Sequence, residues 1–291
     1  FTIGFNQKEF NEANHAKAIA SHLQTDHSEL YIGSSDLLGV IPNLSSIYDE
    51  PFADSSQIPT YLISQFAKQD VTVALSGDGG DELFGGYNRY KITNQYWNKL
   101  KHVPVLIRKL LSAGILSLSA KQIKSIYSFL GKNANYSNFA DKLYKGANVL
   151  PSKDIYSLYK GLTSAYIEPD SIVIDGNESN EFFESNYQKF KGLDNLSIMM
   201  AMDLLTYMPD DILTKVDRAA MGVSLETRVP MLDHKVVEFA LSLSNKYKLR
   251  NNQTKWLLKQ TLYKYVPQNL IERPKSGFAI PIGIWLRTSL K

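Results

Sequence analysis

The sequence predicts an α/β fold, with a doubly wound parallel sheet followed by a large helical second half. Strand-like and helical patterns alternate over residues 1–90, which is the order that builds a parallel sheet covered by helices. The run Val71–Leu75 is short, continuous and rich in β-branched residues, as expected of a strand buried on both faces of such a sheet. Beyond Glu82 the patterns are mostly helical, and no β-rich run of comparable strength follows.

Apolar spacing and capping residues place the elements of the first part. Apolar residues recur at helical spacing between Glu9 and Leu23, and Ser34-Ser35-Asp36 offers an N-cap for a later helix. The expected order is a strand at 1–5, a helix at 9–23, a strand at 27–33, a helix from 34 toward 48, a helix at 58–68 and a strand at 71–75. Ligands of doubly wound folds bind beyond the carboxyl ends of the strands, so we expect a site after Leu75.

Proline, glycine and asparagine residues divide the second part into helices that we expect to pack on the sheet. The expected helices are 88–101, 104–131, 137–145, 153–160, 180–190, 195–208, 211–221, 233–243 (with Asp233 as its N-cap) and 254–265. Several basic residues are spread among apolar ones at helical intervals, which is typical of a solvated helix face rather than a binding surface. They are Lys99, Lys101, Arg108, Lys109, Lys121 and Lys124.

The composition predicts a folded globular protein and argues against several functions. With 44% hydrophobic and 21% charged residues the chain can bury a core, and its net charge of +3 is far from that of a typical nucleic-acid binder. The absence of cysteine excludes a disulfide scaffold, a cysteine-ligated metal and a cysteine nucleophile in this chain, and it fits a cytoplasmic location. The most apolar stretch, 103–120, contains Pro104, Arg108 and Lys109, so we expect no membrane span, and we expect no signal peptide.

The most informative segment, SGDGGDELFGGY at Ser76–Tyr87, directly follows the last expected strand. Its glycines let backbone amides approach a ligand closely, which suits a phosphate. Asp78, Asp81 and Glu82 would repel a phosphate unless a divalent cation lies between, so they suggest Mg²⁺ bridging to a polyphosphate. The alternative is a surface turn before a helix N-terminus, where acidic side chains favour the helix dipole. The segment is neither a Walker A loop nor a dinucleotide-binding loop.

Two further segments carry closely spaced charges. In YMPDDILTKVDRAAMGVSLETRVPMLDH, at residues 207–234, charged and apolar residues are interleaved, which suggests that several charges face inward as pairs. For Asp217, Arg218 and Arg228 the alternative to a functional role is a network of buried salt bridges that anchors the helical layer. The third segment, RPKSGF at Arg273–Phe278, is a tight loop whose lysine could neutralise charge in a transition state near a phosphate.

Together and in this order, the three segments resemble the synthetase domain of glutamine-dependent asparagine synthetases. The resemblance runs from Phe1 to about Trp285. It implies a fold of the HUP or ATP-pyrophosphatase type that uses MgATP to adenylate the aspartate side chain, after which ammonia displaces AMP and gives asparagine. On this basis residues 1–90 are the nucleotide-binding α/β part of the synthetase domain, and residues 91–291 are its mainly helical part.

The resemblance also implies roles for individual residues. Asp81 matches a Mg²⁺ ligand, and Lys275 matches a lysine that neutralises charge on the α-phosphate and pyrophosphate. Asp78 stands where many members carry Glu, at the position tied to forming or consuming the acyl-adenylate. Since ammonia sheds a proton as it attacks, a carboxylate beside the reacting centre can serve as the base. The other expected residues are Ile3, Ser76, Gly77, Gly79 and Gly80 against the nucleotide, mostly through backbone groups, Glu226 in catalysis, and Lys215, Asp217, Arg218 and Arg228 at the substrate.

Two features of the family do not occur in these residues. No SGGxDS pyrophosphate-binding loop precedes the first expected strand, and no cysteine is present to serve as the nucleophile of a glutaminase domain. We therefore expect a partial chain, whose sheet lacks its first strand and whose phosphate-binding loop lies upstream.

The expected partners are ATP, aspartate and ammonia from a glutaminase domain, with neither nucleic acid nor membrane, and a homodimer is left open. Two alternatives are an amidotransferase for another carboxylate, such as a uronic-acid sugar of a surface polysaccharide, and a non-catalytic nucleotide-binding module. The presence of Asp81 and Lys275 argues against the module, because it would have no chemical need for either residue.

Overall fold

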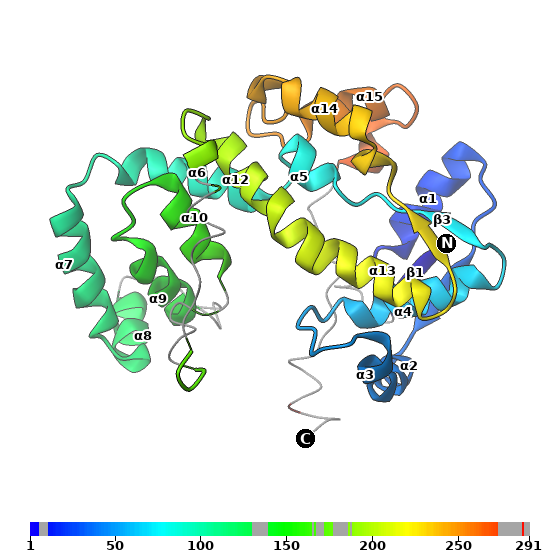
Figure 1. Ribbon diagram of the computed structural model, residues 1–291, viewed down its shortest axis with the longest axis horizontal. Coiled ribbons are helices and arrows are strands. Elements are labelled where there is room, and N and C mark those ends of the chain that lie inside the picture. Colours follow the sequence, from blue (N-terminus) through cyan, green and yellow to red (C-terminus); the bar gives the residue numbers. More distant parts are fainter. Residues whose placement is uncertain are drawn as a thin grey trace. The chain divides into compact units, whose positions relative to one another are not determined.

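The computed structural model describes residues 1–5, 11–129, 139–164, 166, 172–176, 186, 188–272 and 287. They fold into two compact units, one made of Phe1–Gly86 with Asp203–Lys291 and the other of Tyr87–Met202 (Figure 1). The first and last parts of the sequence therefore build one unit, and the middle part builds the other. Within the described ranges, no helix is both long and apolar enough to cross a membrane.

The first unit begins with a parallel strand pair, as the sequence predicts. β1 (Thr2–Phe5) pairs with β2 (Glu29–Ile32), and Ile3 lies opposite Leu30. Helix α1 (Ala13–Leu23) provides the crossover that a parallel pair needs, and it contacts β1. The buried core of this region consists of Ile3, Phe5, Ile32, Leu37, Val40 and Ile58.

A second parallel pair joins distant parts of the sequence. β3 (Val73–Leu75) pairs with β4 (Glu226–Arg228), and Ala74 lies opposite Thr227. The sequence reasoning missed β4, because two of its three residues are charged and so short a strand carries no apolar pattern. The two pairs form separate two-stranded sheets within the described residues. The chain is therefore a helix-rich α/β protein with small parallel sheets.

The expectation that β3 is buried on both faces is wrong. Side chains alternate along a strand, so Ala74 points to one face while Val73 and Leu75 point to the other. Ala74 packs against the core around Leu225. On the other face, 38% of Val73 and 74% of Leu75 are exposed, so the described residues cover Leu75 poorly and Val73 only in part.

The other expected helices of the first unit are present, but the one expected from 34 toward 48 is divided into three, the one at 211–221 begins with a π-helix at Met208, and η5, η6 and α16 were not expected. Helix α2 starts at Ser34 with Gly33 as its N-cap, one residue before the expected cap, and the Asp36 carboxylate accepts from the Gly33 amide at 2.8 Å. Asp233 is confirmed as an N-cap, because its carboxylate accepts from the Lys235 amide at 2.9 Å. The elements are α2 (Ser34–Val40), η2 (Ile41–Asn43), α3 (Leu44–Ile47), α4 (Gln57–Lys68), α5 (Gly80–Phe84), the π-helical η4 (Met208–Leu213), α13 (Thr214–Met221), η5 (Pro230–Leu232), α14 (His234–Ser242), η6 (Asn245–Tyr247), α15 (Trp256–Leu262) and α16 (Gln268–Ile271).

The second unit is helical, with two departures from expectation. The helix expected at 104–131 is divided, because Ser119 and Gln122 form a capping box that starts a new helix. Arg108 is buried rather than solvated, since its guanidinium donates to the carbonyls of Val103 and Leu150 at 2.9 and 3.0 Å. The helices are α6 (Asn88–Leu100), α7 (Val105–Leu116), α8 (Ala120–Phe129), α9 (Phe139–Val149), α10 (Ile155–Thr163) and the first residues of α12 (Asn195–Leu205). The helix expected at 180–190 falls largely outside the described residues.

Candidate functional site

The glycine-rich loop and the second charged segment meet where β3 ends. The Ser76 amide donates to the Arg228 carbonyl at 2.8 Å, which continues the β3–β4 ladder into the loop. Arg228 therefore lies beside the start of the loop, although it is far away in sequence, while Glu226 lies opposite Val73 at the start of β3. Parallel strands end at the same edge of a sheet, so both segments are at the carboxyl edge, where α/β proteins bind their ligands.

Gly79 fixes the path of the loop. Its φ of +81° is in the left-handed region that favours glycine, and a Cβ built there would lie 2.6 Å from the Leu232 Cδ2 atom. The Leu83 amide donates to the Gly79 carbonyl at 3.0 Å, which starts α5. Gly77 differs, because a Cβ built there would have no atom within 4 Å. The loop is therefore packed at Gly79 and open at Gly77.

Asp78 is held by the residue at the start of the loop. The Ser76 hydroxyl donates a short hydrogen bond to the Asp78 carboxylate, and the Asp78 amide lies 3.4 Å from the same hydroxyl oxygen. Both side chains are half-buried. This local turn fixes the carboxylate within the loop.

Asp81, the expected metal ligand, contacts a lysine that the sequence reasoning missed. The Lys255 ammonium lies 3.0 Å from its Oδ2 atom, and both side chains are partly exposed. Gly86 makes room for the pair, since a Cβ built there would lie 2.1 Å from the Asp81 Oδ1 and 2.2 Å from the Lys255 Cε. Among the described residues no three acidic or histidine side chains converge on a metal site. A cation other than Lys255 would therefore need ligands besides Asp81.

A cavity of about 640 Å³ lies against the loop and one face of α4. Its volume is in the range of small-molecule sites. Ser76, Gly77 and Asp78 line it together with Lys215. Its other lining residues are Phe1, Ser56, Thr60, Ile63, Ser64, Ala67, Val71, Val73, Ala74, Leu75, Val216, Leu225 and Thr227.

Ile3 does not line this cavity through its side chain, which is buried in the core. The backbone N–H and C=O groups of Ile3 point away from β2. The Thr2 amide donates to the Ser28 carbonyl at 2.9 Å, on the side of β2. Peptide groups alternate along a strand, so those of Ile3 point away from β2. Any contact from Ile3 to a ligand would therefore use its backbone.

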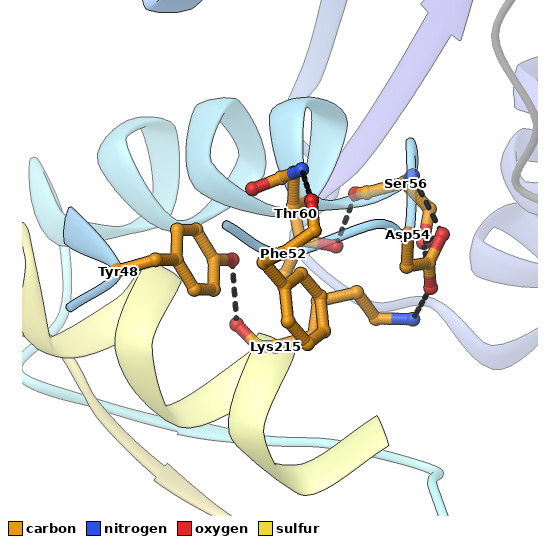
Figure 2. A network of polar contacts seen from close by, with 7 residues as sticks. Tyr48, Phe52, Asp54, Ser56, Thr60 and Lys215 are labelled. Carbon is orange, nitrogen blue, oxygen red and sulfur yellow. Dashed lines mark hydrogen bonds and ion pairs between the residues drawn. The ribbon is translucent and has the colours of Figure 1, made fainter. Parts of the chain in front are cut away.

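Lys215 is buried and paired with a carboxylate from the loop before α4 (Figure 2). Its ammonium lies 2.6 Å from the Asp54 Oδ2 atom, and Asp54 also accepts from the Ser56 amide at 2.8 Å. Burial alone would raise the pKa of Asp54, but the Lys215 ammonium and the Ser56 donors outweigh it and hold that pKa below its usual value. The Tyr48 hydroxyl donates to the Lys215 carbonyl at 3.2 Å, and burial raises the pKa of that hydroxyl.

Apart from the half-buried Asp211, the other charges of the second segment are exposed, which corrects the expectation that several of them face inward. Arg218 pairs with Asp49 at 2.7 Å on the surface, and Asp217 is exposed on the same helix. Glu226 and Arg228 pair with each other at 2.7 Å. They are two residues apart on a strand and so share the outward face, while Thr227 points the other way.

Lys275 lies outside the described residues, whose last continuous range ends just before its loop at Glu272. Glu272 is well anchored. It accepts a short hydrogen bond from the Tyr263 hydroxyl, a bond from the Gln253 amide at 2.8 Å and the Lys259 ammonium at 3.1 Å. The Tyr263 hydroxyl bond holds the pKa of Glu272 below its usual value, and burial with that bond raises the pKa of Tyr263 to about 12.

Comparison with known proteins identifies the family. Residues 1–291 match the family described as asparagine synthase. The chain belongs to the asparagine synthase family.

Its curated relatives carry the same description. The chain is 30% identical over 306 residues to asparagine synthetase [glutamine-hydrolyzing] 1 of Bacillus subtilis (strain 168), covering 100% of this chain and 43% of that protein. It is 29% identical over 287 residues to a putative asparagine synthetase of Mycobacterium tuberculosis (strain ATCC 25618 / H37Rv), covering 99% and 42%. The chain thus spans less than half the length of these relatives.

A third relative matches a shorter region more closely. A putative asparagine synthetase of Methanocaldococcus jannaschii is 47% identical over 87 residues, which is 30% of this chain and 17% of that protein. The resemblance drawn from the three sequence segments is confirmed at the level of the family.

Proposed function

We propose that this asparagine synthase family chain carries the site for ATP-dependent amidation of the aspartate side chain to asparagine. One observation supports this most directly. The β3–β4 pairing brings Arg228, with its partner Glu226, to the glycine-rich loop, and Lys215 lines the same cavity as Asp78. Groups suited to a nucleotide and groups suited to a carboxylate are thus gathered at one sheet edge. We also propose that β1–β2 and β3–β4 belong to one doubly wound sheet in the whole protein.

In the first step an aspartate side-chain oxygen attacks the α-phosphorus of ATP, and pyrophosphate leaves. The peptide groups of Ile3, Ser76 and Gly77 would contact the nucleotide, with Gly79 and Gly80 shaping the turn. Asp81 would hold Mg²⁺, which supplies charge neutralisation to the phosphates. Lys275 would neutralise charge on the pyrophosphate as it leaves.

In the second step ammonia attacks the carbonyl carbon of β-aspartyl-AMP, and AMP leaves. The attacking nitrogen must lose a proton, and Asp78 or Glu226 is the carboxylate that would accept it. Arg218, Arg228, Asp217 and Lys215 would bind the polar groups of aspartate. Glutamine would be the source of ammonia through a glutaminase domain.

The test is aspartate-dependent pyrophosphate release from MgATP by the full-length protein, with asparagine as the product. Asp81→Asn should lower the rate by roughly 100-fold or more, the size expected on losing charge stabilisation of a transition state. Asp70→Asn is the matched control, because Asp70 is exposed at the opposite end of β3. Release that does not depend on aspartate, with a sugar acid as the accepted carboxylate, would reassign the substrate. An unchanged rate in Asp81→Asn would remove Asp81 from the metal site.

A further inference from the structure

We infer that Asp54 is a positioning residue that aims the Lys215 ammonium at an anionic oxygen of the bound substrate. This rests on the proposed function and adds a residue that neither the motifs nor the resemblance identified. Lys215 and Ser56 both line the 640 Å³ cavity, and Asp54 bonds to both of them (Figure 2).

The Lys215 ammonium has more N–H donors than it has acceptor partners. An ammonium carries three N–H groups, and in the part of the chain that the structure describes only Asp54 accepts from it. The residue is 9% exposed, so water reaches it poorly. A buried ammonium with donors left over, on the wall of a cavity, is suited to an anionic oxygen of a phosphate or a carboxylate.

The Asp54 carboxylate is itself fixed. Its Oδ1 accepts from the Ser56 amide at 2.8 Å and from the Ser56 hydroxyl at 2.9 Å, while its Oδ2 accepts from Lys215. The Lys215 carbonyl is held by the Tyr48 hydroxyl. The lysine is thus restrained at both its backbone and its ammonium. Such restraint reduces the conformational entropy that a long side chain loses on binding a ligand.

The position of the pair along the sheet supports a role at the reaction site. α4 leads through a short turn into β3, so its first residues lie at the end of the sheet where β3 finishes. Ser56 and Lys215 therefore lie at the same end as the Asp78 loop, and all three line the cavity. A lysine there would balance the negative charge that Asp78 and a phosphate or carboxylate bring together.

The experiment measures binding as well as turnover in the full-length protein. Calorimetric titrations with MgATP, with pyrophosphate and with aspartate are made on Asp54→Asn, Lys215→Met and the double variant. Lys17→Met is the matched control, since the exposed Lys17 pairs with Glu29 at 2.9 Å. Asp54→Asn keeps an oxygen for the Ser56 donors but offers the ammonium no charge.

We expect Lys215→Met to raise the Kd of one ligand by roughly tenfold or more, as loss of a charged hydrogen bond would. Weaker binding of MgATP and pyrophosphate would assign the anionic oxygen to a phosphate, and weaker binding of aspartate would assign it to a carboxylate. Asp54→Asn should weaken the same ligand, and the double variant should bind no worse than Lys215→Met, because Asp54 acts through Lys215. The double variant also leaves no unpaired buried charge, so it remains measurable if Lys215→Met folds poorly.

Two results would overturn the inference. One is unchanged binding of all three ligands in Asp54→Asn together with a lower unfolding midpoint, which would make the pair structural. The other is additive weakening in the double variant. The proposed function fails separately, if the wild-type protein makes no asparagine while the binding of an anion still depends on Lys215 and Asp54.

Discussion

Replacing Gly79 by alanine should destabilise the first unit, whereas the same change at Gly77 should not. At Gly79 two costs add. A left-handed backbone costs alanine about 1–2 kcal/mol, and a Cβ at 2.6 Å from the Leu232 Cδ2 must displace a packed side chain, which costs about 1–3 kcal/mol. Alanine also lowers the conformational entropy of the unfolded chain, which offsets about 0.4–1 kcal/mol of this loss. We therefore expect Gly79→Ala to lose about 1–5 kcal/mol of unfolding free energy.

Gly77→Ala is the internal control, because it carries the entropy gain without the clash. Its φ lies outside the left-handed region and its Cβ would meet nothing within 4 Å. Its stability should be unchanged or higher by up to about 1 kcal/mol. The assay is urea unfolding of the full-length protein, monitored by far-ultraviolet circular dichroism. The midpoints are compared between variants whose unfolding free energy has the same dependence on urea concentration. Equal midpoints for the two variants would refute the account of the loop as packed at Gly79.

Three further predictions concern Lys275, Gly86 and Glu272. Lys275→Ala should lower kcat far more than it raises the Kd of ATP, because the lysine is proposed to act on transition-state charge; parallel losses would make it a ground-state contact. Gly86→Ala should displace the Asp81 carboxylate and raise the Mg²⁺ concentration that gives half-maximal rate, while Gly39→Ala, which meets no atom within 4 Å, should leave it unchanged. The lowered pKa of Glu272 contributes stability that is present above its usual value of 4.5 and lost as the pH falls through the lowered value, so Glu272→Gln should remove this part of the acid dependence; an identical acid unfolding profile would contradict the anchoring.

Strong local patterns made the first part of the fold predictable. The strand at 2–5, the helix at 13–23 and the strand at 29–32 follow from apolar spacing, and Asp233 follows from capping chemistry. β4 escaped prediction because it forms only through its pairing with β3, which no local pattern encodes. Burial of Arg108 depends on the carbonyls of Val103 and Leu150, and the tertiary fold alone brings the second of these to it.

The candidate site was predictable where residue type defines the chemistry. The loop Ser76–Gly80 was identified because glycines and carboxylates follow a strand. Asp54 and Lys255 were not identified, since each is notable only because it pairs with a charge far away in sequence. A lysine in a helical pattern resembles every other surface lysine until the structure shows the carboxylate beside it. Pairing of distant charges is therefore the part of a site that a single sequence conceals.

The charged residues of the proposed site differ in how readily they can exchange partners. The pairs Asp81–Lys255, Arg218–Asp49 and Arg228–Glu226 are partly or fully exposed, so each contributes only about 0–1 kcal/mol and a ligand can replace either partner at little cost. Lys215–Asp54 is buried, and leaving one of its charges alone would cost about 3–5 kcal/mol. Binding of an anion should therefore add to this pair rather than break it. That difference in burial would make Lys215 a fixed part of the proposed site, while the exposed Arg218 and Arg228 could turn toward a ligand as it arrives.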